Sequence, residues 1–397
     1  VASGYVYELS WQLVLASILM LMVYLINKHI HNFKPAKLRF KVLNRVLPAG
    51  FVCIFVMVFF FSDSLANAGY KPDFWNQSRG YHKTGTFFNF CLNTKYLHVS
   101  KPSEYNANGT ADILESFLEE NGTSTTSETS TNILTGENNY TASTDGTQPN
   151  IICIMNESFS DLGHLGNLQT NEDYMPFIHS LTENTIKGNL YMPVFGAGTS
   201  NSEFEFLTGN TMAFLPSGSI PYQQYINGDL KALPDYLKTL GYQTIATHPY
   251  NAGGWERDTV YPMLGFNESV FKDDYVNPQY VRQYISDESC VDKIIEFYEN
   301  KEKDAPLFVF NVTMQNHGGY QDQYGNFTPD ISVKDSTNFS LQQYLSLVKL
   351  SDSALEHLIS YFEEADEKTV IVFFGDHQPS DAVASTVLAK NGMSWNH

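Results

Sequence analysis

From Asn150 onward, short and uninterrupted apolar runs alternate with longer segments of helical periodicity. Three segments favour helices, at 229–240, 281–300 and 339–365, and in the last of them the apolar residues recur at close to helical spacing. Continuous apolar strands that alternate with helices are typical of a mostly parallel sheet with helices on both faces. The sequence therefore predicts an α/β fold with strands at 151–155, 188–195, 242–247, 307–314 and 369–374.

Polar side chains follow each of these apolar runs at its carboxyl end. In parallel α/β folds, ligands bind beyond the carboxyl ends of the strands, so this edge is the place to look for chemistry. Taken singly, a glutamate in a loop, a threonine in a glycine-rich turn or a lone histidine is more often structural than functional. Packing alone does not readily explain a polar group at the end of every run: Glu157 with Ser158, Thr199, His248, His317, and Asp376 with His377.

Four of these residues would offer a cation three oxygens and one nitrogen, namely Glu157, Thr199, Asp376 and His377. A mixed oxygen and nitrogen set suits Mn²⁺, Mg²⁺ or Zn²⁺ better than a metal that prefers thiolates. A threonine hydroxyl is a poor nucleophile at neutral pH, and metal coordination favours its alkoxide form. Gly196 and Gly198 tolerate unusual dihedral angles, so the backbone can bring Thr199 close to the ion.

Two apolar runs stand near the N-terminus, at 9–26 and 46–61. A membrane-spanning helix needs about 17–25 mainly apolar residues, so both runs suffice when flanking residues are included. We expect two transmembrane helices within a first domain, 1–62; the alternative is a pair of buried core helices. The loop between the runs, 28–45, carries six Lys or Arg and no acidic residue. Such loops stay in the cytoplasm, which predicts that the chain beyond them is extracytoplasmic.

The remainder of the chain is acidic. Residues 1–62 hold 6 basic and 1 acidic side chains, so 63–397 hold 18 and 42, a net charge of −24. This balance argues against nucleic acid as a partner, because nucleic-acid binding needs a basic surface. We interpret 63–149 as a juxtamembrane segment and a linker, since 20 of the 27 residues in 121–147 are Ser, Thr, Asn or Gly. The catalytic domain is expected to occupy 150–397.

The chain starts at Val1 and stops at His397, only 20 residues after His377. A sheet of the expected type should continue with at least one more strand and helix. We therefore expect a fragment of a longer protein, with a catalytic domain that is incomplete at its C-terminus.

Five motifs, taken together, resemble the lipoteichoic acid synthase family. They cover about 150–380, and they occur in the order that the family shows. The resemblance implies an alkaline phosphatase/sulfatase-like fold that is preceded by membrane helices. The motifs are MNESFSDL (155–162), FGAGTSNSEFEFLTG (195–209), THPYNAGGWERDTVYPMLGF (247–266), TMQNHGGY (313–320) and FFGDHQP (373–379).

The resemblance also implies a role for each matching residue. Thr199 matches the nucleophile, and the metal ligands would be Glu157, Thr199, Asp376 and His377, usually around Mn²⁺, with Mg²⁺ or Zn²⁺ as alternatives. His317 matches a position that holds the head group, and its imidazole could move a proton, so we count it as catalytic. The expected head-group residues are Ser158, His248, Trp255, Arg257 and His317.

The resemblance implies a membrane phosphoglycerol transferase that acts outside the cell. Phosphatidylglycerol would be the donor lipid, and a glycolipid or a polyglycerolphosphate chain the acceptor. Alternatives are a phosphoethanolamine transferase, a transferase that adds phosphoglycerol to a glycan, and a sulfatase or phosphodiester hydrolase. A formylglycine sulfatase needs a C/S-x-P-x-R motif, which the chain lacks. From another class, a non-catalytic anchored binding protein would bind no stoichiometric divalent ion.

Overall fold

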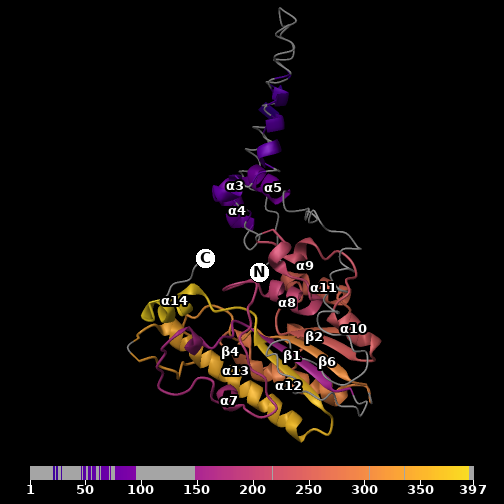
Figure 1. Ribbon diagram of the computed structural model, residues 1–397, viewed down its shortest axis with the longest axis vertical. Helices are drawn as coiled ribbons and strands as arrows, with labels where there is room; N and C mark the ends of the chain where they lie inside the picture. Colours follow the sequence, from indigo (N-terminus) through magenta and orange to yellow (C-terminus); the bar gives the residue numbers. More distant parts are fainter. Residues whose placement is uncertain are drawn as a thin grey trace, which may run out of the picture. The chain divides into compact units, whose positions relative to one another are not determined.

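The structure is a computed structural model (Figure 1). It describes residues 148–392 apart from 217, 304 and 335, together with 77–94 and scattered residues between 21 and 72. The chain divides into two compact units, Val1–His98 and Val99–His397, and each is described by itself. The linker predicted at 121–147 and nearly all of the loop at 28–45 lie outside the described residues.

The first unit contains short helices. They are α3 (Ser64–Asn67), α4 (Gln77–Thr84) and α5 (Thr86–Thr94), and Gly85 between the last two has a φ of 78°. The described residues of 46–61 are helical and mostly exposed, whereas 9–26 falls almost wholly outside the described residues. Among the residues that can be described, no helix has both the length and the apolar character that crossing a bilayer requires. The two transmembrane helices remain a prediction.

The second unit is built on a parallel sheet of five strands (Figure 1). In spatial order the strands run β3-β2-β6-β1-β7, so β1 pairs with β6 on one side and with β7 on the other. The prediction of a mostly parallel sheet is confirmed. The strands are β1 (Asn150–Asn156), β2 (Gln243–His248), β3 (Glu268–Phe271), β6 (Leu307–Val312) and β7 (Thr369–Gly375).

One predicted strand is wrong, and one strand of the main sheet was not predicted. Residues 188–195 form no strand, and Leu190 and Tyr191 are 61% and 91% exposed. Apolar side chains alone suggested a strand there, but Pro193 has no N–H to give to a sheet and the chain stays on the surface. The missed strand, β3, has only four residues and begins with an exposed glutamate.

The three predicted helical segments are confirmed in part. Segment 339–365 is the long helix α13 (Phe339–Glu364), which Asn338 caps by accepting a hydrogen bond from the amide of Leu341. Segment 229–240 contains the shorter helix α10 (Leu233–Thr239). Segment 281–300 begins instead with part of a hairpin, and its helix, α12 (Asp287–Asn300), starts after Ser286, a residue type favoured at that position.

The remaining elements are short, except for two helices of ten residues. A two-stranded hairpin lies outside the main sheet, and six of the described helical segments of this unit consist of at most five residues each. The remaining helices and strands are α7 (Pro176–Ser180), α8 (Thr199–Thr208), α9 (Pro221–Gln224), α11 (Arg257–Met263), α14 (Asp381–Lys390), β4 (Tyr280–Val281) and β5 (Tyr284–Ile285), and the 3-10 segments are Leu162–Leu165, Met212–Phe214, Gly254–Glu256 and Lys272–Asp274.

Helices cover the sheet on both faces, as the sequence predicts. Cys153 and Met155 of β1 pack against side chains of α8, α10 and α11. Ile152 and Ile154, which point the other way, pack against α12 and α13, and Figure 1 shows these two helices side by side. Because successive strand residues point to opposite faces, one uninterrupted apolar run supplies both cores.

Candidate active site

The carboxyl ends of β1 and β7 bring two acidic residues together. In the paired strands Asn156 lies opposite Gly375, so the next residues, Glu157 and Asp376, leave the sheet side by side. The amide of Asp376 donates to the carbonyl of Asn156 at 3.2 Å. Oxygens of both carboxylates lie within 4.8 Å of each other and of a ring nitrogen of His377, and all three residues are buried. The backbone pairing of two neighbouring strands therefore sets the spacing of these groups.

His377 presents one ring nitrogen to the carboxylates. Its Nδ1 lies 2.9 Å from the carbonyl oxygen of Gln378, which can only accept, so Nδ1 carries a proton. Its Nε2 lies 3.2 Å from Asp376 Oδ2 and 3.7 Å from Glu157 Oε1. Burial opposes the charged ring, but the two carboxylates outweigh it and raise the pKa of His377. The ring therefore points Nε2, the nitrogen that could coordinate a metal ion, toward the two carboxylates.

The buried carboxylates of Glu157 and Asp376 lie so close together that a bound cation would stabilise their charged forms. Burial, and then the charge of Glu157, raise the pKa of Asp376 to about 7, and burial likewise raises the pKa of Glu157. Within the described part of the chain, Asp376 Oδ2 has no well-aligned hydrogen-bond donor. Carboxylate oxygens and an imidazole nitrogen are donors that suit Mn²⁺, Mg²⁺ or Zn²⁺, so these side chains fit a divalent ion.

Thr199 opens helix α8 beside this group. Gly196 and Gly198 have φ angles of 66° and 92°, and they turn the chain into the helix as their residue type permits. The Thr199 side chain is 7% exposed, and its hydroxyl hydrogen bond lowers the pKa of Asp376. The helix also places its positive end at Thr199, where negative charge is stabilised.

Ser158 lies against both carboxylates. Its amide donates to Asp376 Oδ1 at 2.6 Å, and its hydroxyl donates to Glu157 Oε1 at 2.8 Å. The residue has a φ of 51°, a left-handed conformation that is uncommon for a residue with a side chain. In the structure Ser158 therefore holds the two carboxylates, and its contact with the head group stays a prediction.

His248 is a neutral hydrogen-bond acceptor at the end of β2. Its Nδ1 lies 2.9 Å from the carbonyl oxygen of Val312, so Nδ1 carries the proton and Nε2 keeps a free lone pair. Burial, and then the nearby cation of Arg257, hold the pKa of His248 well below its usual value. Its Nε2 can accept a hydrogen bond from a substrate hydroxyl.

His317 is held by the β4–β5 hairpin. The Tyr284 hydroxyl lies 3.0 Å from His317 Nδ1, and the buried guanidinium of Arg282 donates to the carbonyls of Gln315, His317 and Gly318. Burial, and then the neighbouring His377, lower the pKa of His317 to about 4, so the ring is neutral at neutral pH. The sequence missed both Arg282 and Tyr284, because only the folded chain brings them to His317.

Arg257 is committed to a buried ion pair. Its Nε donates to both carboxylate oxygens of Glu203, at 3.1 and 3.2 Å, and the two side chains are 2% and 0% exposed. Trp255 and Glu256 precede Arg257 with φ angles of 59° and 61°, and such consecutive left-handed residues are strained. Trp255 is half-buried and packs against the core near α8 and α11.

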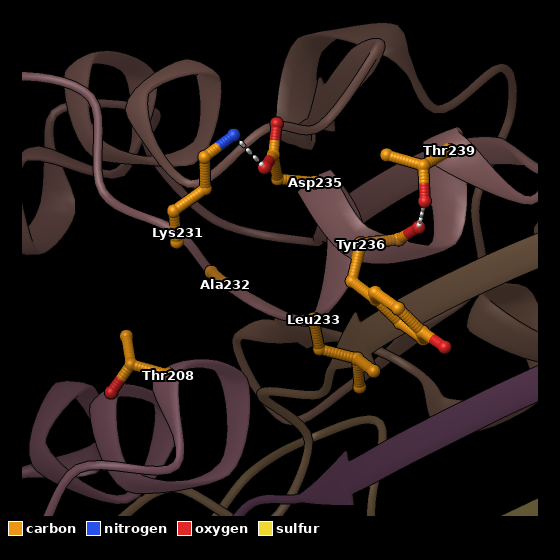
Figure 2. Close-up of a pocket in the computed structure, with 7 residues that line it drawn as sticks. All are labelled: Thr208, Lys231, Ala232, Leu233, Asp235, Tyr236 and Thr239. Atoms are coloured by element: carbon orange, nitrogen blue, oxygen red, sulfur yellow. Dashed lines mark hydrogen bonds and ion pairs between the residues drawn. The ribbon is translucent and has the colours of Figure 1, made fainter. Parts of the chain in front are cut away.

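Two other features lie apart from this site. An open cavity of about 430 Å³ is lined by side chains of α10 and by Thr208 at the far end of α8, and it includes no predicted site residue (Figure 2). A second set of possible ligands lies between α12 and α13, where His357 Nδ1 is 2.8 Å from Glu288 Oε1 beside Asp292. Because these side chains are partly or fully exposed, an ordinary surface ion pair accounts for them.

The chain matches the sulfatase family over residues 149–390. The chain belongs to this family. Its α/β architecture is thus that of the sulfatase and alkaline phosphatase-like domains, as the sequence predicts.

Curated relatives are considerably longer than this chain. A Rhizobium meliloti (strain 1021) protein provisionally named for cyclic beta-1,2-glucan modification is 33% identical over 313 residues, which are 78% of this chain and 44% of that protein. The capsular polysaccharide biosynthesis protein RkpI of the same organism is 27% identical and covers 58% of this chain and 41% of its own length. The sulfatase-family chain thus spans less than half of each of these relatives.

Solved structures share the fold. The Streptococcus pyogenes phosphoglycerol transferase GacH, solved with sn-glycerol-1-phosphate, has a TM-score of 0.58 at 24% identity over 74% of this chain and 75% of its own. The Listeria monocytogenes lipoteichoic acid synthase LtaP has a TM-score of 0.50 at 22% identity over 59% and 57%. At these identities the likeness establishes the fold and leaves the reaction to be argued from the side chains.

Proposed function

We propose that this chain is the catalytic part of a membrane-anchored, metal-dependent phosphoglycerol transferase. It would move glycerophosphate from phosphatidylglycerol to an acceptor hydroxyl through a covalent threonine intermediate, as in polyglycerolphosphate synthesis. The observation that carries the proposal is the convergence of a hydroxyl, two carboxylates and an imidazole at one sheet edge: Thr199, Glu157, Asp376 and His377.

The proposed metal site consists of these four residues and holds Mn²⁺, with Mg²⁺ or Zn²⁺ as alternatives. Such an ion, when bound, lowers the pKa of a coordinated hydroxyl and neutralises negative charge on phosphoryl oxygens. Ser158 keeps both carboxylates in place through its two hydrogen bonds. The positive end of α8 adds to the stabilisation of negative charge beside Thr199.

In the first half-reaction, Thr199 Oγ1 forms a bond to the phosphorus of phosphatidylglycerol, and the bond from phosphorus to the diacylglycerol oxygen breaks. In the second, the acceptor hydroxyl forms the new bond to phosphorus and the bond to Thr199 breaks. In each step the attacking hydroxyl loses one proton and the leaving oxygen gains one. We assign this transfer to the imidazole of His317, because the neutral ring has one nitrogen that can accept a proton.

The proposed head-group site uses the remaining predicted residues. Arg257 would donate to a phosphate oxygen from Nη1, which donates to the carbonyl of Gly254 at 3.3 Å, since Nε and Nη2 face Glu203. The free Nε2 of His248 would accept a hydrogen bond from a glycerol hydroxyl. Trp255, half-buried at the turn before Arg257, would pack against the glycerol carbons.

A second acceptor class is a glycan. The relative provisionally named for cyclic beta-1,2-glucan modification is 33% identical over 78% of this chain, and this favours a sugar hydroxyl over a growing polyglycerolphosphate or a glycolipid. Both readings keep the same donor and the same threonine intermediate. They differ only in which hydroxyl completes the second half-reaction.

Anchoring at a cell membrane is part of the proposal. The apolar runs at 9–26 and 46–61 would span the bilayer on either side of a basic cytoplasmic loop, with the catalytic domain outside. A donor that is a membrane lipid makes such an anchor useful, because the active site must reach the lipid head groups.

The test supplies the full chain with Mn²⁺ and phosphatidylglycerol labelled in its head-group glycerol. Without acceptor, we expect diacylglycerol release and a peptide containing Thr199 that gains one glycerophosphate in mass. Added cyclic glucan or polyglycerolphosphate should then take up the label and so identify the acceptor. Transfer from labelled phosphatidylethanolamine alone, or hydrolysis of a sulfate ester alone, would replace the proposal with one of its rivals.

A further inference from the structure

A buried carboxylate behind the metal-binding edge links three elements of the site. Asp287 is the first residue of α12 and is 3% exposed. Its Oδ2 accepts hydrogen bonds from Asn156 Nδ2 at 2.8 Å and from the Ser351 hydroxyl at 2.5 Å. No ion pair to this carboxylate is found within the described part of the chain, and its partners there are polar groups and the start of the helix.

The first link runs to both candidate metal-binding carboxylates through Asn156. This residue ends β1 directly before Glu157, and its carbonyl accepts the amide of Asp376. The hydrogen bond between Asn156 and Asp287 therefore holds the backbone at the end of β1 in place. Glu157 follows directly on this backbone, and Asp376 is hydrogen-bonded to it.

A second link to Glu157 runs through Thr313. The Thr313 hydroxyl accepts the amide of Glu157 at 3.0 Å, and it also interacts with the Asp287 carboxylate. Asp287 thus supports the position of Glu157 in two ways. It holds Asn156, the residue before Glu157, and it interacts with the Thr313 hydroxyl that accepts the amide of Glu157.

The third link reaches the loop that carries His317. The amide of Asp287 donates to Gln315 Oε1 at 3.0 Å, and Asn316 Nδ2 donates to Asn156 Oδ1 at 3.0 Å and to the Ser351 hydroxyl at 2.9 Å. Asn316 is fully buried. The two residues before His317 are therefore held in the same network as Asn156.

We propose that Asp287 is a positioning residue that sets the geometry of the metal ligands Glu157 and Asp376 and of the His317 loop. It acts through the hydrogen bonds that its carboxylate accepts from Asn156 and Ser351, through its interaction with Thr313, and through the hydrogen bond that its amide donates to Gln315. The inference rests on the proposed metal site but not on the identity of the lipid or acceptor. Residues that orient metal ligands from behind typically change metal affinity by about 10- to 100-fold when they are removed.

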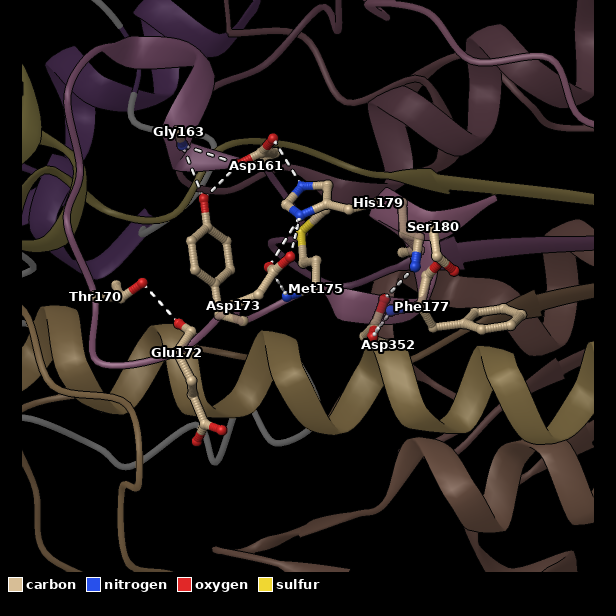
Figure 3. Close-up of polar contacts among 12 residues, drawn as sticks. Asp161, Gly163, Thr170, Glu172, Asp173, Met175, Phe177, His179, Ser180 and Asp352 are labelled. Atoms are coloured by element: carbon tan, nitrogen blue, oxygen red, sulfur yellow. Dashed lines mark hydrogen bonds and ion pairs between the residues drawn. The ribbon is translucent and has the colours of Figure 1, made fainter. Parts of the chain in front are cut away.

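The chain offers a matched control in Asp352. This aspartate is also buried, at 1% exposed, and it accepts two hydrogen bonds, from the amides of Phe177 at 2.9 Å and Ile178 at 2.8 Å (Figure 3). Those amides belong to α7, which supplies no residue of the site. Replacing Asp352 thus removes a comparable buried carboxylate without touching the network of Asp287.

The experiment measures Mn²⁺ affinity by calorimetry and thermal unfolding for Asp287→Ala, Asp287→Asn, Asp352→Ala and the unchanged full chain. An asparagine keeps an oxygen that can accept from Asn156 and Ser351, so it tests geometry without charge. We expect Asp287→Ala to bind Mn²⁺ about 10- to 100-fold more weakly, Asp287→Asn to bind within about threefold of the unchanged chain, and Asp352→Ala to lose stability without losing affinity.

Two results would overturn the inference. Unchanged Mn²⁺ affinity in a folded Asp287→Ala chain would leave Asp287 a structural residue like Asp352. Equal losses in the Asn and Ala variants would show that charge, and not hydrogen-bond geometry, is what matters. Because the readout is metal affinity, a failure of lipid turnover would count against the proposed function and leave this inference to be judged on its own.

Discussion

Glu203 lies one helical turn after Thr199 on α8, and its buried carboxylate holds the guanidinium of Arg257. Tyr261 also donates to Glu203, at 2.7 Å, so the acceptor capacity of the carboxylate is largely used. One helix therefore positions both the candidate nucleophile and the candidate phosphate-binding cation. It follows that the net charge of the Glu203–Arg257 pair is zero, and Arg257 offers directed hydrogen bonds more than a net positive charge.

Replacing Arg257 by lysine should weaken donor binding and spare metal binding. Lysine keeps the charge but loses the forked geometry, and a hydrogen bond to a charged group contributes about 1.5–3 kcal/mol, so KM for phosphatidylglycerol should rise by about 10-fold or more. Separate titrations with Mn²⁺ and with lipid vesicles measure the two effects. The alanine variant is a poorer choice, because an unpaired buried Glu203 would cost about 3–5 kcal/mol of stability. Parallel losses of metal and lipid binding in the lysine variant would contradict the assignment of Arg257.

Thr199→Ala should abolish the covalent intermediate and the turnover of lipid while the fold persists. The side chain is small and stands at the start of α8, so its loss removes the hydroxyl with little change in packing. Mass spectrometry of the trapped peptide and thermal unfolding measure the two properties. The matched control is Thr208→Ala at the other end of the same helix, whose hydroxyl donates to the carbonyl of Phe204 and accepts from the amide of Asn210. Full activity of the Thr199 variant would remove the threonine from the mechanism.

Asp376→Ala should lose both the bound divalent ion and activity. The carboxylate lies 3.2 Å from His377 Nε2 and is fully buried, so its loss removes an oxygen ligand from the centre of the proposed metal site. Metal content of the purified full chain after dialysis against Mn²⁺ is the measurement. Glu288→Ala serves as the control, because it alters the exposed set beside His357. If the Glu288 variant lost the ion and the Asp376 variant kept it, the metal site would lie between α12 and α13 instead.

His179 should make the fold more stable at mildly acidic than at alkaline pH. Burial opposes its charge, but Asp173 at 2.8 Å and Asp161 at 3.4 Å raise the pKa of His179 (Figure 3). Since the folded-state pKa lies above the unfolded value of about 6.5, the charged ring stabilises the fold fully below that pH, and the effect disappears as pH rises through the folded-state pKa. The ring is 40% exposed, so screening limits the gain to less than about 1 kcal/mol.

Comparing thermal unfolding of His179→Gln with the unchanged chain at pH 5.5 and pH 9 tests this expectation. The variant should be less stable at pH 5.5 and equal at pH 9. The same difference at both pH values would mean that the ring acts through packing and not through its charge.

The sequence predicts β1, β6 and β7 from their apolar runs, which in β1 and β6 reflect burial on both faces of the sheet, and β2 from a shorter apolar stretch. It fails at 188–195, where apolar residues are exposed on the surface, and at β3, which is too short to form a pattern. The strand-end rule directs attention to Glu157, Asp376 and His377, which the fold brings within reach of one cation.

The supporting residues could not be found in the same way. Glu203 might have been suspected from its position four residues after Thr199 on one helix face. Asp287 and Arg282 give no such signal, because their partners lie far away in sequence: Asn156 is 131 positions from Asp287, and Gln315 is 33 from Arg282. The local sequence pattern therefore predicts the side chains at the strand ends, which would face a ligand. The side chains that support them, such as Asp287 and Arg282, can be identified only from the folded structure.

The placement of β1 between β6 and β7 has a consequence for biogenesis. This first strand finds its neighbours only when β6 and β7 have been made, and Ser158 and Asp376, bonded to each other in the finished molecule, are separated by 218 positions. Contacts between such distant segments slow folding and leave apolar strands open to aggregation in the meantime. A nascent chain would thus be vulnerable until β7 is synthesised, because only then do the carboxylates that could take up a cation come together.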